Sequence, residues 1–135
     1  PDYHLIIAPA EQGEEKAIAW GPKGRVIADA ASPFDGQANS QALTKETEAH
    51  PAALWATALS INGFANWYLP ARHELRLAYL NAPESFSTDD WYWSSTQYAG
   101  YADTAWTQYF VIGTQYGHDK SFQGRARAVR RFLIN

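Results

Sequence analysis

The chain has 135 residues, of which 46% are hydrophobic and 19% are charged, and this composition is typical of one folded domain. Its net charge of -3 argues against general binding to nucleic acid. Cysteine is absent, which excludes disulfides, thiolate metal sites and cysteine nucleophiles. No apolar run reaches the roughly 18 residues that a membrane-spanning helix needs, so membrane insertion is not predicted.

Residues 1–28 predict an N-terminal β segment. Tyr3–Ala8 is a short apolar run, and Lys16–Trp20 and Arg25–Ala28 flank a turn that contains Gly and Pro, which favours a hairpin. Residues 29–41 are rich in Ala, Ser, Asp, Gly and Asn and predict a surface connection. They do not predict a domain boundary, because the β segment before them is too small to fold alone.

Residues 41–80 predict the helical part of the domain. Helical character runs from Gln41 to Leu59, and Pro favours the first turn of a helix, so Pro51–Leu59 is the firmer segment. A second helix is predicted at Pro70–Tyr79. We expect the adjacent pair His73-Glu74 on a solvated face of that helix, because neighbours on a helix point about 100° apart and do not act on one substrate atom.

Residues 91–133 predict a β-rich, ligand-presenting part. Hydrophobicity alternates along Trp106–Ile112, so Trp106, Phe110 and Ile112 are expected to be buried, whereas Thr107, Tyr109 and Val111 face outward. Thr114–Phe122 is polar and interrupted by Gly, and it predicts a hairpin connection. Arg125–Leu133 predicts a further strand.

Sequence motifs for catalysis are missing. The chain has no nucleophile elbow, Walker loop, dinucleotide fingerprint or H-E-x-x-H helix, and its histidines are scattered. Ser94-Ser95-Thr96 favours a buried turn over a nucleophile. Asp89-Asp90 favours a turn or a helix cap, although its carboxylates leave a structural calcium ion open. We therefore predict no cofactor and no enzyme activity.

Four separated motifs carry a family resemblance. They are Gly63–Leu75, Tyr92–Thr96, Ala105-Trp106 with Phe110 and Gly113, and Arg127–Arg130. In this order, over about residues 35–132, the chain resembles the Lcl C-terminal-domain family, whose members are C-type-lectin-like domains of bacterial surface proteins and phage tail proteins. The resemblance implies an α+β fold with two helices packed on small twisted antiparallel sheets, and a ligand surface on a β-rich face. Members often have Cys near the final Arg, where this chain has Ala126 and Ala128, so their disulfide is excluded.

A second resemblance concerns the segment between Tyr92 and Arg130. It resembles the variable region of proteins targeted by diversity-generating retroelements, in which ligand-contacting positions change within a fixed lectin-like scaffold. The related formylglycine-generating enzymes depend on cysteine or bound copper, so the absence of Cys argues against their activity here.

The closing arginines have two interpretations. They are Arg125, Arg127, Arg130 and Arg131. As a patch they would bind sulfated or sialylated sugars. As structural residues they would brace neighbouring loops, and we favour this role because Arg127 and Arg131 share one strand face while Arg130 lies on the other.

Exposed Tyr among small polar residues is a composition typical of recognition surfaces. Trp67, Trp93 and Trp106 are predicted to pin the scaffold from inside. The candidate ligand-binding residues are Tyr98, Tyr101, Asp103, Thr107, Tyr109, Val111, Thr114, Tyr116, His118, Asp119, Ser121 and Phe122. The alternative for each tyrosine is that it packs on the domain itself.

The sequence therefore predicts one domain over residues 1–135 that binds a host cell-surface glycan or protein receptor without transforming it. The expected setting is the virion tail tip, in a phage tail fibre, or alternatively the bacterial cell surface, in an adhesin. Display on a homo-oligomer such as a trimer is expected to supply avidity. The alternative function is a structural or assembly module whose aromatic face is a subunit interface. In that case Tyr109 and Tyr116 would be buried against a neighbouring subunit.

Overall fold

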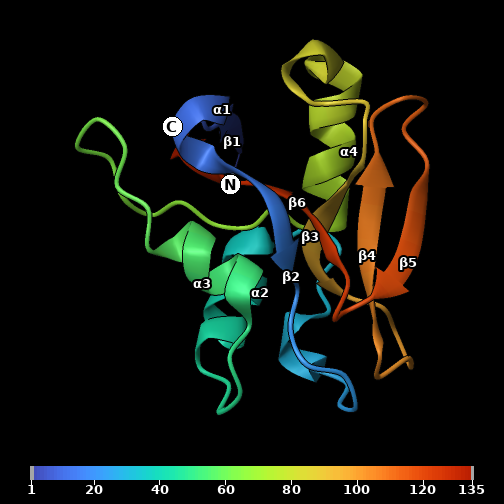
Figure 1. Ribbon diagram of the computed structural model, residues 1–135. Coiled ribbons are helices and arrows are strands. Elements are labelled where there is room, and N and C mark those ends of the chain that lie inside the picture. Colours follow the sequence, from blue (N-terminus) through green and yellow to red (C-terminus); the bar gives the residue numbers. More distant parts are fainter. Residues whose placement is uncertain (1, 135) are drawn as a thin grey trace.

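A computed structural model describes residues 2–134, whose fold is α+β, as the sequence predicted (Figure 1). Its elements are β1 (Tyr3–Ile7), α1 (Ala10–Gly13), β2 (Glu14–Ala19), η1 (Ala28–Ala30), α2 (Gly36–Thr44), α3 (Pro51–Thr57), α4 (Arg72–Asn81), η2 (Pro83–Ser85), β3 (Trp91–Gln97), β4 (Thr104–Tyr109), β5 (Gln115–Asp119), β6 (Gln123–Arg127) and β7 (Val129–Leu133). Likeness to C-type lectins stays a prediction. None of the described helices is long and apolar enough to cross a membrane.

Two sheets organise the fold. The larger has five strands in the order β2-β6-β3-β4-β5, and all its pairings are antiparallel except β3 with β6. Strands β1 and β7 form a separate antiparallel pair, with Tyr3 opposite Leu133 and Ile7 opposite Val129. This pairing brings the two ends of the chain together on one side of the molecule, while β5 lies at the far edge of the larger sheet (Figure 1).

The central strand β3 is buried along its whole length because helices cover both faces of the sheet. Trp91 and Trp93 pack into a hydrophobic cluster with residues of α2 and α3. Tyr92, which points the opposite way, packs with Leu75 and Phe110 in a second cluster beside α4. The alternation of β3 thus joins two cores and fixes the sheet between them.

The helical prediction was right in kind and wrong in its boundaries. Residues 29–41, predicted as a connection, contain the start of α2, because Asp35 Oδ1 accepts a hydrogen bond from the Ala38 backbone N–H at 3.0 Å and caps the helix. This helix ends at Thr44, so residues 45–50, which were predicted to be helical, are not. The family resemblance implied two helices packed on the sheets. Residues 2–134 instead contain α2, α3 and α4, together with α1, which is a single turn.

Three strand predictions were wrong, two of them because the true partners are distant in sequence. The predicted hairpin of residues 16–28 does not form, since β2 pairs with β6 and the Ile27 N–H donates to Gln97 Oε1. The predicted connection after Thr114 contains strand β5. The predicted strand Arg125–Leu133 is split at Ala128, whose N–H donates to the Gly13 carbonyl as the chain passes from one sheet to the other.

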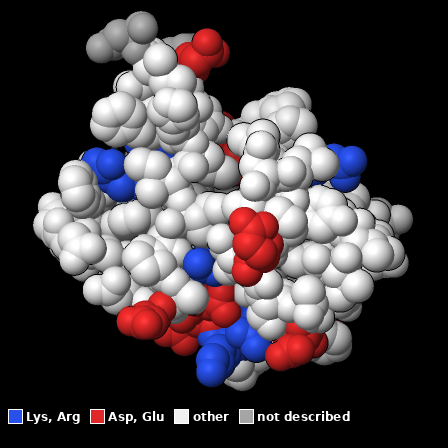
Figure 2. All heavy atoms as spheres, turned by 90° about the horizontal axis from the view of Figure 1, so that it is seen from above, with Lys and Arg blue, Asp and Glu red and all other residues white. Residues whose placement is uncertain are grey.

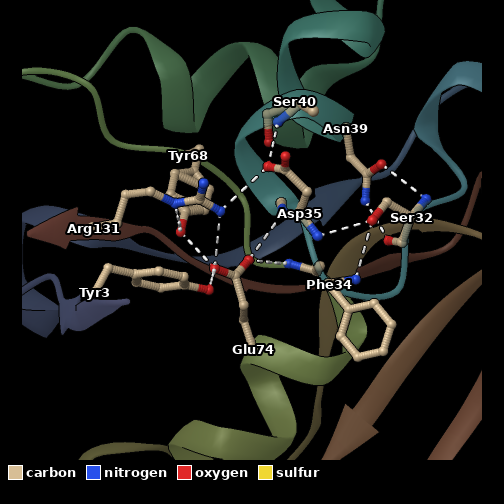
Figure 3. A network of polar contacts seen from close by, with 12 residues as sticks. Tyr3, Ser32, Phe34, Asp35, Asn39, Ser40, Tyr68, Glu74 and Arg131 are labelled. Atoms are coloured by element: carbon tan, nitrogen blue, oxygen red, sulfur yellow. Dashed lines mark hydrogen bonds and ion pairs between the residues drawn. The ribbon is translucent and has the colours of Figure 1, made fainter. Parts of the chain in front are cut away.

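A buried carboxylate joins elements from both ends of the chain (Figure 3). Glu74 is only 2% exposed, so the predicted solvated face is wrong for this residue, although His73 beside it is exposed. Its Oε2 accepts hydrogen bonds from the hydroxyls of Tyr3 at 2.7 Å and Tyr68 at 2.6 Å, and it lies 3.5 Å from Arg131 Nη2. Burial, followed by this hydrogen bond, raises the pKa of Tyr3 to about 12.

The same carboxylate also holds backbone groups. Glu74 Oε1 accepts hydrogen bonds at 3.0 Å from the N–H groups of Gly36 and Ala71, which lie at the starts of α2 and α4. These donors have no partner inside their own helices, so the side chain satisfies groups that burial would otherwise leave unpaired. Glu74 therefore ties two helix starts to the β1–β7 pair.

The closing arginines brace the fold, as favoured from the sequence. Arg127 is buried and donates to the Ala8 and Ser85 carbonyls and to Glu14, which also pairs with Arg125. Arg130 donates to the Ala65 carbonyl, and Arg131 belongs to the Glu74 network. On the face seen in Figure 2, Lys and Arg side chains stay in small separate groups, several of them beside Asp or Glu. They do not merge into one basic patch.

Candidate ligand-binding groove

A groove of about 500 Å³ opens at the end of the β4–β5 hairpin. It is lined by Tyr109, Val111, Ile112, Thr114, Tyr116, Gly117 and His118. The hairpin register places Thr107 opposite Tyr116 and Ala105 opposite His118, so the odd residues of β4 and the even residues of β5 share one face. This register brings together five residues that the sequence predicted to bind ligand: Tyr109, Val111, Thr114, Tyr116 and His118.

Aromatic rings form one wall of the groove. The rings of Tyr109 and Tyr116 meet nearly at right angles, with centroids 5.6 Å apart, and His118 lies 6.0 Å from Tyr109. Behind them, Trp91 stacks on His118 at 4.1 Å, and Gly124 leaves the space that Trp91 occupies, because a Cβ there would lie 2.0 Å from the indole. Tyr116 is 51% exposed. The groove therefore presents exposed ring surface on a packed support.

The orientation of His118 is fixed by its neighbours. Thr107 Oγ1 lies 3.0 Å from the Tyr116 carbonyl and 2.8 Å from His118 Nδ1. Since the single hydroxyl proton donates to the carbonyl, Oγ1 accepts from Nδ1, which must carry the proton. Burial lowers the pKa of His118, so the ring is neutral at neutral pH and its Nε2 is an acceptor.

The lining of the groove has no Lys, Arg, Asp or Glu. A carboxylate outside the lining, Asp90, precedes Trp91, and Trp91 is paired with Tyr109 in the sheet. Burial raises the pKa of Tyr109, and the negative charge of Asp90 raises it further. Asp90 therefore places a negative charge close enough to act on both Tyr109 and His118.

Comparison with known protein families identifies the family of this chain. Residues 14–130 match the sequence profile of the Lcl C-terminal domain. The chain belongs to this family. Membership indicates a domain of the surface or receptor-binding type. A comparison with curated proteins finds no match.

Three burial predictions for this Lcl domain were wrong, and the first failed because β4 ends at Tyr109. Beyond that residue the alternation stops, so Ile112, predicted to be buried, is 72% exposed and lines the groove. Thr107, predicted to face ligand, is 1% exposed because it lies beneath Tyr116 and His118. Trp106, expected to pin the scaffold from inside, is half-buried.

Trp106 lies on the opposite face of the hairpin from the groove. Its ring stacks against Tyr98 with centroids 4.3 Å apart, and the guanidinium of Arg72 lies 3.7 Å from its centroid. Tyr98 therefore packs on the domain itself and not in the groove. Trp67 and Trp93 are buried, as predicted.

The remaining predicted site residues gather at the other end of the hairpin. Asp103 accepts a hydrogen bond from the Gly24 N–H, and Asp119 pairs with Lys23 at 3.4 Å and accepts from Ser121. These contacts attach the hairpin to the loop after β2. Two aromatic residues at this end are exposed, Tyr101 and Phe122. The predicted site is thus two separate regions, at opposite ends of the hairpin.

Sequence reasoning missed Gly117 in the groove lining and Trp91 as the support behind His118. Trp91 carried no signal, since its contacts with Gly124 and His118 come from strand pairings of long sequence separation. Gly117 had a detectable signal, because Gly inside a strand marks the close approach of another group. Here a Cβ would lie 2.7 Å from the Tyr98 ring.

Asp89 and Asp90 take part in a turn, as the sequence favoured. The Trp91 N–H donates to Asp90 Oδ1 at 2.8 Å, and the Asp89 N–H donates to Ser87 Oγ at 3.1 Å. Over residues 2–134, no group of three or more His, Asp and Glu is placed to hold a metal ion.

Proposed function

We propose that this domain is a non-catalytic receptor-binding module that recognises a cell-surface glycan or protein through the aromatic groove. The observation that carries the proposal is the placement of Tyr109, Tyr116 and His118 on one rigid hairpin face beside exposed Val111 and Ile112. Rigid aromatic rings offer large contact area at little entropic cost. Family membership supports the same class of function.

The polar groups of the groove favour binding over catalysis. His118 is the one strong proton acceptor in the lining, and its Nδ1 is already held by Thr107. A general acid–base site needs a partner group at hydrogen-bond distance from the reacting atom, and the lining supplies no carboxylate. We therefore propose that the domain binds its ligand and releases it chemically unchanged.

The proposed setting is the tip of a phage tail fibre or a bacterial surface adhesin. One open groove of this size supports weak binding at a single site, so several copies on a homo-oligomer would supply avidity. Exposed apolar residues on the terminal strand β7, Phe132 and Leu133, offer a surface for such association. A trimer is one arrangement that would present three grooves together.

A second function, an assembly module, is favoured by one observation. Val111 and Ile112 are 59% and 72% exposed beside the groove, and adjacent exposed apolar side chains often mark protein interfaces. If this face contacts a neighbouring subunit, its tyrosines are buried in the particle. The solution mass of the intact chain and of an Ile112→Ser variant separates the two functions, because only an interface residue changes the oligomeric state.

The test of receptor binding compares the parent chain with Tyr109→Ala plus Tyr116→Ala, on whole cells and on a glycan array. A matched control, Tyr101→Ala plus Phe122→Ala, removes two aromatic rings from the other end of the hairpin. Tyr116→Ala alone is included because that side chain is exposed and its loss spares the core. We expect about tenfold or greater loss of binding in the groove variants and none in the control. Equal binding by all variants refutes the proposed site.

A further inference from the structure

We propose that the groove binds a quaternary ammonium group, of the choline type, carried by the cell-surface ligand. This inference rests on the proposed function and names the chemistry that the groove selects. It is argued from the ring geometry, the charges around the groove and the hydrogen-bonding capacity of its lining.

The ring geometry suits a cation without N–H groups. Tyr109 and Tyr116 meet at 83°, and His118 is inclined to Tyr109 by 55°, so the rings form the walls of a corner. A cation in such a corner lies near more than one ring face, and each face attracts it through its negative quadrupole. The adjacent Val111 and Ile112 offer apolar contact to methyl groups.

The charges around the groove favour the same class of ligand, a cation. The lining has no cation that would attract sulfate, phosphate or a sialic-acid carboxylate. Asp90 is half-buried at the start of β3, next to the residue that pairs with Tyr109, and it raises the pKa of Tyr109 and opposes the fall in the pKa of His118. His118 is neutral at neutral pH and does not repel a bound cation. Charge complementarity therefore favours a positive ligand.

The hydrogen-bonding capacity of the lining separates a quaternary from a primary ammonium. A lysine-type ammonium has three N–H donors that must keep acceptors when water is removed. The Thr114 carbonyl already accepts from the Tyr109 N–H, and the Tyr116 carbonyl already accepts from Thr107. His118 Nε2 is one strong acceptor in the lining, and it can serve only one of the three donors. A trimethylammonium group needs no acceptor and loses nothing at such a lining.

The test is an NMR titration of the intact chain with choline and with 3,3-dimethylbutan-1-ol, which has the same shape and no charge. The ring signals of Tyr109, Tyr116 and Trp91 are followed, and butylammonium serves as the primary-ammonium probe. We expect saturable shifts with choline, and affinity at least about fivefold lower for the uncharged alcohol and for butylammonium. Similar affinities for choline and either comparison probe, or no saturable shift with choline, overturn the proposal.

Two variants test whether the charge of Asp90 contributes to choline binding. Asp90→Asn keeps an oxygen for the Trp91 N–H and removes the charge, so we expect weaker choline binding, while Asp103→Asn at the other end of the hairpin leaves it unchanged. Equal affinity in Asp90→Asn and Asp103→Asn contradicts the charge argument. Binding of the domain to whole cells is measured in a separate experiment. If it depends on Tyr109 and Tyr116 but free choline does not compete with it, the receptor-binding function stands and the ammonium specificity is wrong.

Discussion

Replacing Glu74 with Gln tests whether the buried carboxylate holds the scaffold of the groove. The amide is nearly isosteric with the carboxylate, and its single oxygen can still accept from the N–H groups of Gly36 and Ala71. Its NH₂ group then faces the hydroxyls of Tyr3 and Tyr68, which at present donate to a charged oxygen. The substitution therefore changes charge and donor direction while it preserves shape.

The expected cost follows from the contacts. A hydrogen bond to a charged group stabilises by about 1.5–3 kcal/mol and a neutral one by about 0.5–1.5, so weakening two phenol contacts costs about 2 kcal/mol. Arg131 loses one of its two carboxylate partners and keeps Asp35. Glu74→Ala also leaves two buried N–H groups unpaired, so we expect about 3–5 kcal/mol.

Urea denaturation followed by Trp fluorescence measures these costs, with equal m-values as the condition for comparing midpoints. Arg76→Gln, on the exposed side of the same helix, is the matched control and should change the free energy of unfolding by no more than about 0.5 kcal/mol. A Glu74→Gln variant as stable as this control would refute the reasoning. So would equal costs for Gln and Ala, because the backbone contacts would then contribute nothing.

Three further predictions concern packing and pH. Gly124→Ala should destabilise the fold by about 1–3 kcal/mol and weaken ligand binding, since the new Cβ displaces Trp91 from behind His118, whereas exposed Gln123→Ala should do neither. Burial lowers the pKa of Lys120 to about 8, so between pH 8 and the unfolded value of about 10.5 the unfolded chain binds more protons and stability rises with pH. In urea titrations from pH 7.5 to 9.5 this rise should vanish in Lys120→Met, and its persistence there would contradict the assignment. Burial also lowers the pKa values of His50 and His118, so stability is full above pH 6.5 and falls as the pH drops toward the folded values. Thermal melts between pH 7 and 5 should show this fall, and a smaller one in His50→Asn.

The groove shows where sequence reasoning succeeds and where it stops. Alternation along one strand correctly placed Tyr109 on the outward face, and the polar, Gly-containing stretch after it correctly placed Tyr116 near solvent. The same alternation failed at Ile112, because a pattern does not say where the strand ends. It failed at Thr107 because side chains of the neighbouring strand cover an outward-facing residue.

Long-range contacts account for most of what could not be predicted. Glu74 lies on a helix whose local pattern suggests a solvated pair, and its burial depends on Tyr3 and Arg131 from the two ends of the chain. The helices, the central Trp93 and the bracing arginines were predictable because each has a local pattern or a geometric limit. The partners of β6 and β7 were not predictable, because β1, β2 and β3 are distant from them in sequence.

Hydroxyl-radical footprinting of the domain bound to its target cells tests the central claim most directly. Side-chain oxidation of Tyr116 and Ile112 is compared between free and bound protein, with exposed Tyr101 and Phe122 as internal references. If the groove is the contact surface, binding protects Tyr116 and Ile112 and leaves the references unchanged. Protection confined to Tyr101 and Phe122, with Tyr116 oxidised equally in both states, would show that ligand binds elsewhere on the domain.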